Sequence, residues 1–228
     1  MRLLAAAGYP SIAPDLPGYG ASAGFPLETY ALETQTKALA EFARRLDLDL
    51  VHIAGNSMGG AIAVLYAEAN PRGIASVGFI GAPLGLIGWS PSITNSLKKG
   101  TNPFIPLDRS EFDLELALLF ARAPVIPDSI KDLAVAEYLA RERHYRQVWD
   151  IANLYTDCLT LRSLFSTPVF ALWGTFDRVF AVEGARALSK LAPLATILSL
   201  PDVGHLPHVE APGASASAYL GFLSSLGK

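Results

Sequence analysis

The chain has 228 residues, of which 51% are hydrophobic and 17% charged, and its net charge is −3. This composition excludes a disordered chain, and because no block of Lys or Arg exists, we expect no nucleic-acid partner. The length suits one domain with a sizeable core, or a domain that carries an inserted subdomain. The single cysteine, Cys158, cannot form an internal disulfide, so it does not indicate a compartment; we interpret it as a small buried apolar residue.

Short apolar runs alternate with helical patterns in the first third of the chain, which is typical of strand–helix–strand units on a parallel sheet. The residues Asp15–Gly20 form a Pro/Gly turn. We expect strands at Ser11–Pro14, Leu50–Ala54 and Ser76–Ile80, one helix at Leu27–Leu46, and an Ala-rich helix that ends near Ala69.

The pattern changes between residues 82 and 166, where no clear strand is found. Helical segments near Glu111–Arg122 and Ile130–Ile151 indicate a helical insertion, or cap, within a core of residues 1–81 and 167–228. The sheet resumes after the insertion. We expect strands at Pro168–Trp173 and Thr196–Leu200 and helices at Val182–Leu191 and Gly213–Leu226.

Two segments invite a membrane or secretory interpretation. Met1–Ala7 is too short for the apolar core of a signal peptide. Gly73–Leu97 carries no charge, but Pro83 and Pro91 interrupt it, so we interpret it as a buried strand followed by a loop.

The five residues Gly55-Asn-Ser57-Met-Gly59 lie between an expected strand and an expected helix. This context indicates a nucleophile elbow, a sharp turn that exposes the Ser57 hydroxyl above the sheet. We expect Gly55 and Gly59 to be required because side chains there would collide with the neighbouring strand and helix. The helix N-terminus behind Ser57 would favour a developing oxyanion.

A serine nucleophile needs a nearby base, and the chain offers four histidines. We interpret His52 as a structural residue of its strand and His144 as part of a solvated helix face. His205 and His208 follow the last expected strand, at the carboxyl edge of the sheet, where active groups of open α/β sheets gather. We choose His205, which follows Gly204, over His208.

Asp177 follows the expected Val169–Trp173 strand, also at the carboxyl edge. The order Ser57, Asp177, His205 is the order of nucleophile, acid and base in α/β hydrolases. A turn residue or helix cap is the alternative interpretation of Asp177. We interpret Asp15 as structural because Asp-Leu-Pro-Gly is a turn-forming sequence.

The chain resembles the α/β-hydrolase superfamily over its whole length. Carried over, the resemblance makes Ser57 the nucleophile, Asp177 the acid, His205 the base and the amide of Met58 one oxyanion donor. The segments that match are Ile12–Gly20, Gly55–Gly60, Leu172–Asp177 and Gly204–Pro212.

Within the superfamily, the chain looks like bacterial lipases and the esterases similar to monoacylglycerol lipase. The alternative is a carbon–carbon bond hydrolase of the aromatic-degradation type. Those enzymes usually carry Trp after the base, and Leu206 stands there in this chain, which favours ester substrates. A binding module that retains the fold without catalysis is a further alternative.

The family pattern also includes a strand and a His-Gly loop before the first helix, and the loop supplies a second oxyanion amide. Met1–Gly8 resembles the end of that first helix. We therefore expect on the order of 40–70 residues to be absent, including a strand between the Ser11–Pro14 and Leu50–Ala54 strands. A signal or anchor would lie in that upstream part; without one, the cytoplasm is the default expectation.

The sequence predicts a serine hydrolase that cleaves carboxylic esters through an acyl-enzyme, with no metal and no organic cofactor. A small-molecule ester or lipid is the expected partner, and the oligomeric state is left open. The cap would form a lid over an apolar acyl pocket. Its candidate lining, for which packing within the cap is the alternative role, is Leu84, Leu86, Ile87, Phe104, Leu118, Leu119 and Phe120.

Overall fold

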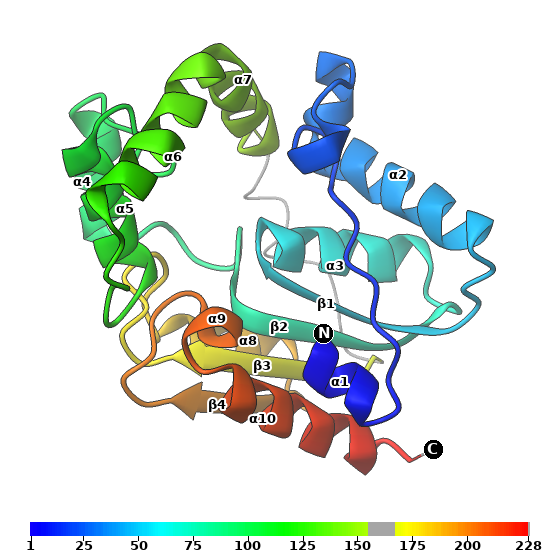
Figure 1. Ribbon diagram of the computed structural model, residues 1–228. Coiled ribbons are helices and arrows are strands. Elements are labelled where there is room, and N and C mark those ends of the chain that lie inside the picture. The colour runs from blue at the N-terminus through cyan, green and yellow to red at the C-terminus, as the bar shows by residue number, and fades with distance from the viewer. Residues whose placement is uncertain (155–166, 228) are drawn as a thin grey trace.

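The computed structural model describes residues 1–154 and 167–227, so Cys158 lies outside the described residues. A sheet of four parallel strands forms the centre of the fold (Figure 1). The strands follow one another in chain order, as β1 (Val51–Ser57), β2 (Ile74–Pro83), β3 (Val169–Gly174) and β4 (Thr196–Leu200). The predicted α/β architecture is therefore confirmed.

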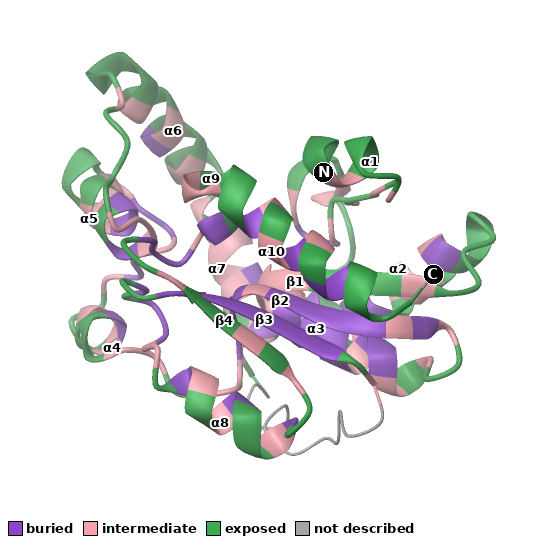
Figure 2. Cartoon of the chain, turned by 90° about the horizontal axis from the view of Figure 1, so that it is seen from below, coloured by how far each residue is buried: buried purple, intermediate pink, exposed green. Residues whose placement is uncertain are grey.

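Helices cover both faces of the sheet, and Figure 2 shows α8 and α10 on opposite sides of it. One face packs against α2 (Leu32–Arg45), α3 (Met58–Ala69) and α8 (Gly184–Leu191), through small and aliphatic residues that surround Phe79. The other face packs against α10 (Pro212–Ser225), where Tyr219, Phe222 and Leu223 cover Phe170 and Leu172 of β3. Every residue of β3 is buried because helices lie on both of its sides.

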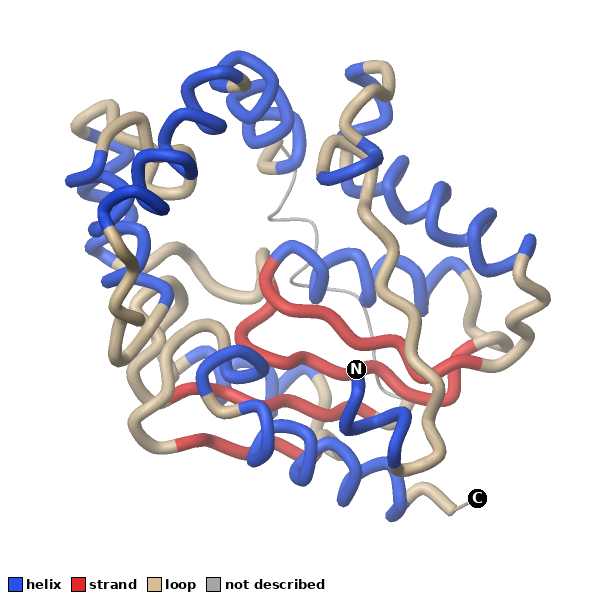
Figure 3. The backbone as a smooth tube through the Cα atoms, in the orientation of Figure 1, coloured by secondary structure: helices blue, strands red, loops and turns tan. Residues whose placement is uncertain are grey.

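Four helices of the insertion, α4 (Pro91–Lys98), α5 (Arg109–Leu119), α6 (Asp128–Ala140) and α7 (Glu142–Ala152), gather beyond the carboxyl ends of the strands (Figure 3). Ion pairs from Arg109 to Asp128 and Asp132, and from Lys131 to Asp113, join α5 to α6. The cap helices therefore lie over the sheet edge at which the predicted site residues are placed.

Short helical segments complete the described chain: the helices α1 (Arg2–Ala6) and α9 (Pro207–Glu210) and the 3₁₀ turns η1 (Gly20–Ser22) and η2 (Leu27–Tyr30). The expected Leu27–Leu46 helix is divided, since Ala31 is extended between η2 and α2. The helices α4 and α9 were not predicted from the sequence.

The strand expected at Ser11–Pro14 is wrong, because these residues run without regular structure. A strand needs a neighbour with which to exchange main-chain hydrogen bonds. None of the described strands pairs with this segment, and Ile12 is 57% exposed. The interpretation of Gly73–Leu97 is confirmed for β2 and the loop after it, but α4 begins at Pro91, so the end of the segment is helical and not a loop. No helix among the described residues has both the length and the apolar character of a membrane span.

Candidate active site

The nucleophile candidate Ser57 is the last residue of β1, and α3 begins at the next residue. Its backbone has φ of 50° and ψ of −119°, a conformation that costs a non-glycine residue on the order of 1–3 kcal/mol. Such strain persists only where surrounding structure enforces it. A Cβ on Gly55 would lie 2.1 Å from the backbone of Gly59, so the turn closes only with glycine at position 55.

The expectation for Gly59 is wrong. Apart from its chain neighbours and the backbone of α3 itself, a Cβ built there meets no atom within 4 Å, so a side chain at this position has open space. The crowded position is the next one, Gly60, where a Cβ would lie 2.8 Å from the Pro83 side chain. Close packing of α3 on β2 therefore depends on Gly60 rather than Gly59.

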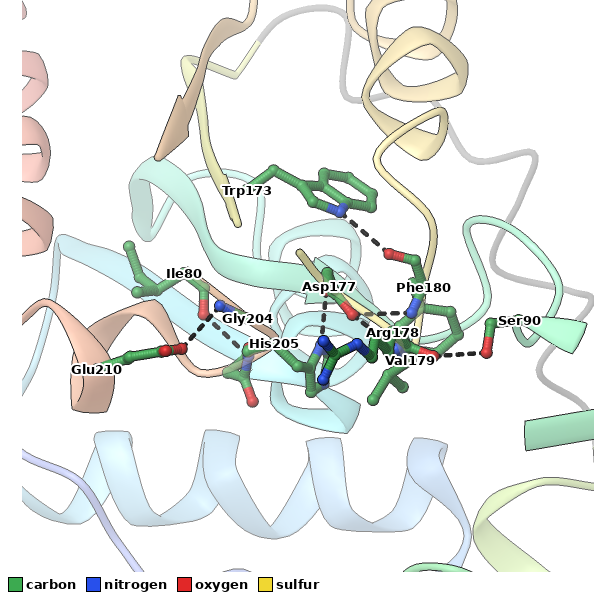
Figure 4. Close-up of polar contacts among 11 residues, drawn as sticks. Ile80, Ser90, Trp173, Asp177, Arg178, Val179, Phe180, Gly204, His205 and Glu210 are labelled. Carbon is green, nitrogen blue, oxygen red and sulfur yellow. Dashed lines mark hydrogen bonds and ion pairs between the residues drawn. The ribbon is translucent and has the colours of Figure 1, made fainter. Parts of the chain in front are cut away.

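Asp177 and His205 are joined by a hydrogen bond of 2.8 Å between Oδ2 and Nδ1, although they lie in loops 28 residues apart (Figure 4). Both side chains are almost completely buried, at 0% and 2% exposure. The other carboxylate oxygen, Oδ1, accepts hydrogen bonds of 2.9 Å from the amides of Val179 and Phe180. The carboxylate is therefore held by three donors, and its orientation toward the imidazole is fixed.

This arrangement determines which histidine nitrogen is free. Because a carboxylate only accepts hydrogen bonds, Nδ1 of His205 carries the proton and Nε2 keeps its lone pair in the neutral ring. The Phe180 ring lies 5.7 Å from the imidazole, and its main-chain oxygen accepts from Trp173 Nε1. Buried neighbours therefore hold the ring in the tautomer that a general base requires.

Asn56, between Gly55 and Ser57, connects the elbow to the histidine loop. Its Nδ2 donates to the main-chain oxygens of Ile80, at 2.9 Å, and of His205, at 3.0 Å. Gly81, with φ of 98°, leaves room for this amide, since a Cβ there would lie 2.2 Å from Nδ2. The amide thus brings β1, β2 and the His205 loop together beside Ser57.

Met58, the candidate oxyanion donor, is the first residue of α3, so its amide is among those that lack an acceptor within the helix. The Tyr19 hydroxyl lies 3.6 Å from Met58 Sδ, and burial raises the pKa of Tyr19 to about 12. Tyr19 belongs to the turn that Asp15 closes by accepting from the Ala21 amide, so the structural interpretation of Asp15 agrees with its contact.

The other three histidines lie elsewhere. His208 is exposed on α9, and Nδ1 of His52 contacts Ser76 Oγ at 2.8 Å near the amino ends of β1 and β2. The interpretation of His144 as a solvated residue is wrong. Its Nε2 lies 2.7 Å from the Gly18 oxygen and its ring meets Tyr30 edge-on, so it joins α7 to the core.

The candidate lining residues belong largely to the packing between cap and core. Leu84 and Leu118 are buried, at 5% and 4% exposure, whereas Leu86, Ile87, Phe104 and Leu119 are partly buried against one cluster. A stack of aromatic rings crosses this boundary. It runs from Phe180 to Trp89, at 4.7 Å, and on to Trp149 and Phe104, at 5.5 and 5.3 Å between successive rings.

Within residues 1–154 and 167–227, no cluster of three or more His, Cys, Asp or Glu side chains has the arrangement of a metal site. At the carboxyl edge of the sheet, Asp177 and His205 contact each other directly, and the turn that carries Ser57 reaches the histidine loop through the Asn56 amide.

Comparisons with known proteins point to one family. The model of the alpha/beta hydrolase family matches residues 1–218. The chain is 30% identical to Lipase 1 of Psychrobacter immobilis, covering 96% of the chain and 70% of the lipase. It is 31% identical to Lipase 3 of Moraxella sp. (strain TA144), covering 97% of the chain and 71% of the lipase.

A crystal structure of a membrane phospholipase A, described as a bacterial virulence factor, superimposes on this fold with a TM-score of 0.76 at 29% identity. The superposition covers 93% of this chain and 69% of the phospholipase. The shared architecture extends over nearly the whole of the chain.

Proposed function

The chain belongs to the alpha/beta hydrolase family, and from this premise we propose that it is a serine hydrolase that cleaves carboxylic esters through an acyl-enzyme. The roles are those of nucleophile for Ser57, base for His205 and orienting acid for Asp177. The observation that carries the proposal is the buried 2.8 Å contact between Asp177 and His205, at the sheet edge where the strained Ser57 turn ends β1.

The chemistry follows from these three groups. Ser57 Oγ attacks the ester carbonyl carbon while His205 Nε2 takes the hydroxyl proton, and the carbonyl electrons move to oxygen. The amide of Met58 donates to that oxyanion. Collapse expels the alcohol, which takes the proton from His205. Water then attacks the acyl-enzyme by the same route and releases the carboxylic acid.

Asp177 stabilises the imidazolium that forms in each step. It accepts the Nδ1–H bond and is itself held by the amides of Val179 and Phe180, so its charge is already oriented before the reaction begins. No metal or organic cofactor takes part in this scheme.

The cap, residues 82–166, is proposed as a lid domain on a core of residues 1–81 and 167–228. The partner would be a small-molecule ester or a lipid, since the similar proteins are named lipases and a phospholipase. Two of the candidate lining residues, Leu84 and Leu118, are buried and are therefore packing residues. For the acyl chain we retain the partly buried candidates, which are Leu86, Ile87, Phe104, Leu119 and Phe120.

A carbon–carbon bond hydrolase is the second candidate, and Leu206 at the position after His205 favours esters over it. A panel of p-nitrophenyl esters of increasing acyl length, run beside a ring-fission diketone, distinguishes the two. Ester turnover that rises with acyl length would support the proposal, since each buried methylene contributes up to about 0.8 kcal/mol. Turnover of the diketone alone would reject it.

A fluorophosphonate probe gives a second test, because it reacts covalently with an activated serine. Labelling of the chain would exclude the non-catalytic binding module. Absence of both labelling and ester turnover would reject the proposed function.

A further inference from the structure

The end of helix α5 in the cap forms hydrogen bonds with two loops of the core, the loop that carries Asp177 and the loop that carries His205. The residues concerned are 117–122, called here the α5 end segment. This segment and the histidine loop are far apart in sequence, with 88 residues separating Arg122 from Glu210. The bonds between them are therefore tertiary contacts between cap and core.

Glu210, the last residue of α9, makes the contact on the histidine side. Its Oε2 accepts from the amide of Gly204, at 2.7 Å, and from the amide of Ala121, at 3.2 Å. Its Oε1 accepts from the amide of Arg122, at 3.0 Å. One carboxylate therefore bonds two residues of the cap and the residue that precedes His205, and Figure 4 shows its approach to Gly204.

The backbone of the His205 loop adds a hydrogen bond in which the loop is the donor and the cap is the acceptor. The amide of His205 donates to the Leu119 oxygen at 2.8 Å. The approach is so close that a Cβ on Gly204 would lie 2.5 Å from that oxygen and 2.7 Å from the Ala121 nitrogen. Glycine at position 204 is therefore a requirement of this contact.

Arg178 makes the contact on the acid side, directly after Asp177. Its Nη1 donates to the oxygens of Ala117, at 2.6 Å, and Phe120, at 3.3 Å. Carbonyls at a helix end lack partners within the helix, and a cation at a helix C-terminus is also favoured by the helix dipole. The α5 end segment thus lies between the acid loop and the base loop and bonds to each.

From these contacts we infer that Glu210 and Arg178 are positioning residues for the base: they fasten the α5 end segment so that it fixes the His205 loop relative to Asp177. Neither residue takes part in proton transfer. The inference rests on the proposed function, since it concerns the placement of the proposed base. The inference also gives the cap a role in catalysis through the α5 end segment. This role is separate from any movement of the cap over the substrate.

Glutamine at position 210 provides the sharpest test because it preserves size and removes one acceptor oxygen. Whichever way the side-chain amide turns, its NH₂ group faces at least one of the three amides, and that bond is lost. Small displacements of reacting groups can lower rates by about 100-fold. We expect Glu210→Gln to reduce kcat on p-nitrophenyl butyrate by about 10-fold to 100-fold, with KM changed by no more than about threefold.

A spectroscopic signature and an exchange measurement separate positioning from a general loss of folding. Hydrogen exchange at the amides of Ala121, Arg122 and Gly204 should accelerate in Glu210→Gln, while that of the β3 amides stays as in the wild type. The downfield proton resonance of His205 Nδ1 should shift or broaden. Glu210→Asp, which keeps two acceptor oxygens but is one methylene shorter, should recover part of kcat.

Arg178→Gln supplies an independent variant if Glu210→Gln fails to fold. It should accelerate exchange in the α5 end segment from the acid side and lower kcat by about 10-fold, with KM little changed. Glu183→Gln is the matched control, since Glu183 lies outside these contacts, at the start of α8.

One outcome would overturn the inference and leave the proposed function standing. In that outcome the wild type turns over esters, and both Glu210→Gln and Arg178→Gln keep the wild-type kcat and the wild-type hydrogen exchange. A wild-type chain that neither labels with fluorophosphonate nor turns over esters would overturn the proposed function, and this inference with it. Reduced kcat, faster exchange at the three amides and partial recovery by Asp would support it.

Discussion

The side-chain amide nitrogen of Asn56 lies 3.0 Å from the main-chain oxygen of His205, so the residue before the proposed nucleophile holds the loop of the proposed base. The same nitrogen lies 2.9 Å from the Ile80 oxygen. The amide of Asn56 therefore uses both of its hydrogens to tie β2 and the loop of the proposed base to the end of β1.

Asn56→Asp should lower both stability and turnover. A carboxylate in that place donates no hydrogen bond and would face the two carbonyl oxygens, with a cost of about 1–3 kcal/mol. Urea unfolding and kcat on a short ester are the measurements. Asn70→Asp is the control for turnover, since the Asn70 amide donates to Tyr66 at the end of its own helix. Unchanged kcat in Asn56→Asp would contradict the assigned role.

Ser57→Ala should abolish fluorophosphonate labelling and lower kcat by about 10³-fold or more, because the hydroxyl that forms the acyl-enzyme is gone. Mass spectrometry of the probe-treated chain checks the labelled residue. Label that persists after the Ser57→Ala substitution would identify a different nucleophile.

His205→Ala should remove nearly all turnover, whereas His208→Ala should retain a substantial part, because it is His205 that contacts Asp177. Turnover of the wild type should rise with pH along one limb, since a general base must be neutral to accept a proton. Rates measured from about pH 5 to pH 9 for all three proteins decide the matter. A larger loss in His208→Ala would move the base to His208.

The two glycines of the elbow, Gly55 and Gly59, and the adjacent Gly60 should respond differently to alanine. Gly55→Ala should prevent normal folding, because its Cβ would lie 2.1 Å from backbone atoms that cannot move away. Gly60→Ala should cost about 1–3 kcal/mol through its contact with Pro83. Gly59→Ala should be neutral or stabilising by up to about 1 kcal/mol, since it adds a helix former in open space. Thermal melting of the three variants tests this order, and an equal loss in all three would refute it.

Glu115, on α5, should make stability depend on pH. Burial raises the pKa of its carboxyl from 4.5 to about 7. Between these values the unfolded chain releases a proton that the folded chain keeps, so this group's contribution to stability falls as pH rises from 4.5 to about 7 and is constant above that.

Glu115→Gln removes this dependence because the amide is neutral throughout. At pH 8 the variant should be more stable than the wild type by on the order of 3 kcal/mol, and the gain should shrink toward pH 4.5. Urea unfolding at pH 5 and pH 8 measures it, with Glu28→Gln, an exposed glutamate, as the control. A gain of equal size at both pH values would show that the carboxyl is not the cause.

Much of the fold was predictable because its signals are local. The strands of the sheet follow from apolar runs that end at Gly or Pro, and the Thr196–Leu200 strand has the predicted bounds. The expected strand at Ser11–Pro14 failed because an apolar run specifies a strand only where a neighbour accepts its hydrogen bonds.

In the candidate site, too, local features were predictable and contacts between distant residues were not. Ser57, Asp177 and His205 were selected by motif and chain order, and the Asp177–His205 contact agrees with that selection. The contacts of Asn56 and Glu210 could not be predicted from the sequence. Their partners lie 149 and about 88 residues away, and nothing in a local pattern reports such a distance.

The aromatic stack gives the chain an internal optical reporter. The sequence has three tryptophans, and all three are connected to Phe180. Trp89 stacks on the Phe180 ring and Trp149 stacks on Trp89. Trp173 donates a hydrogen bond to the main-chain oxygen of Phe180. Phe180 in turn lies against His205. A displacement of the cap that separates these rings should therefore change the tryptophan emission, so that movement beside the proposed catalytic pair could be followed in the unlabelled protein.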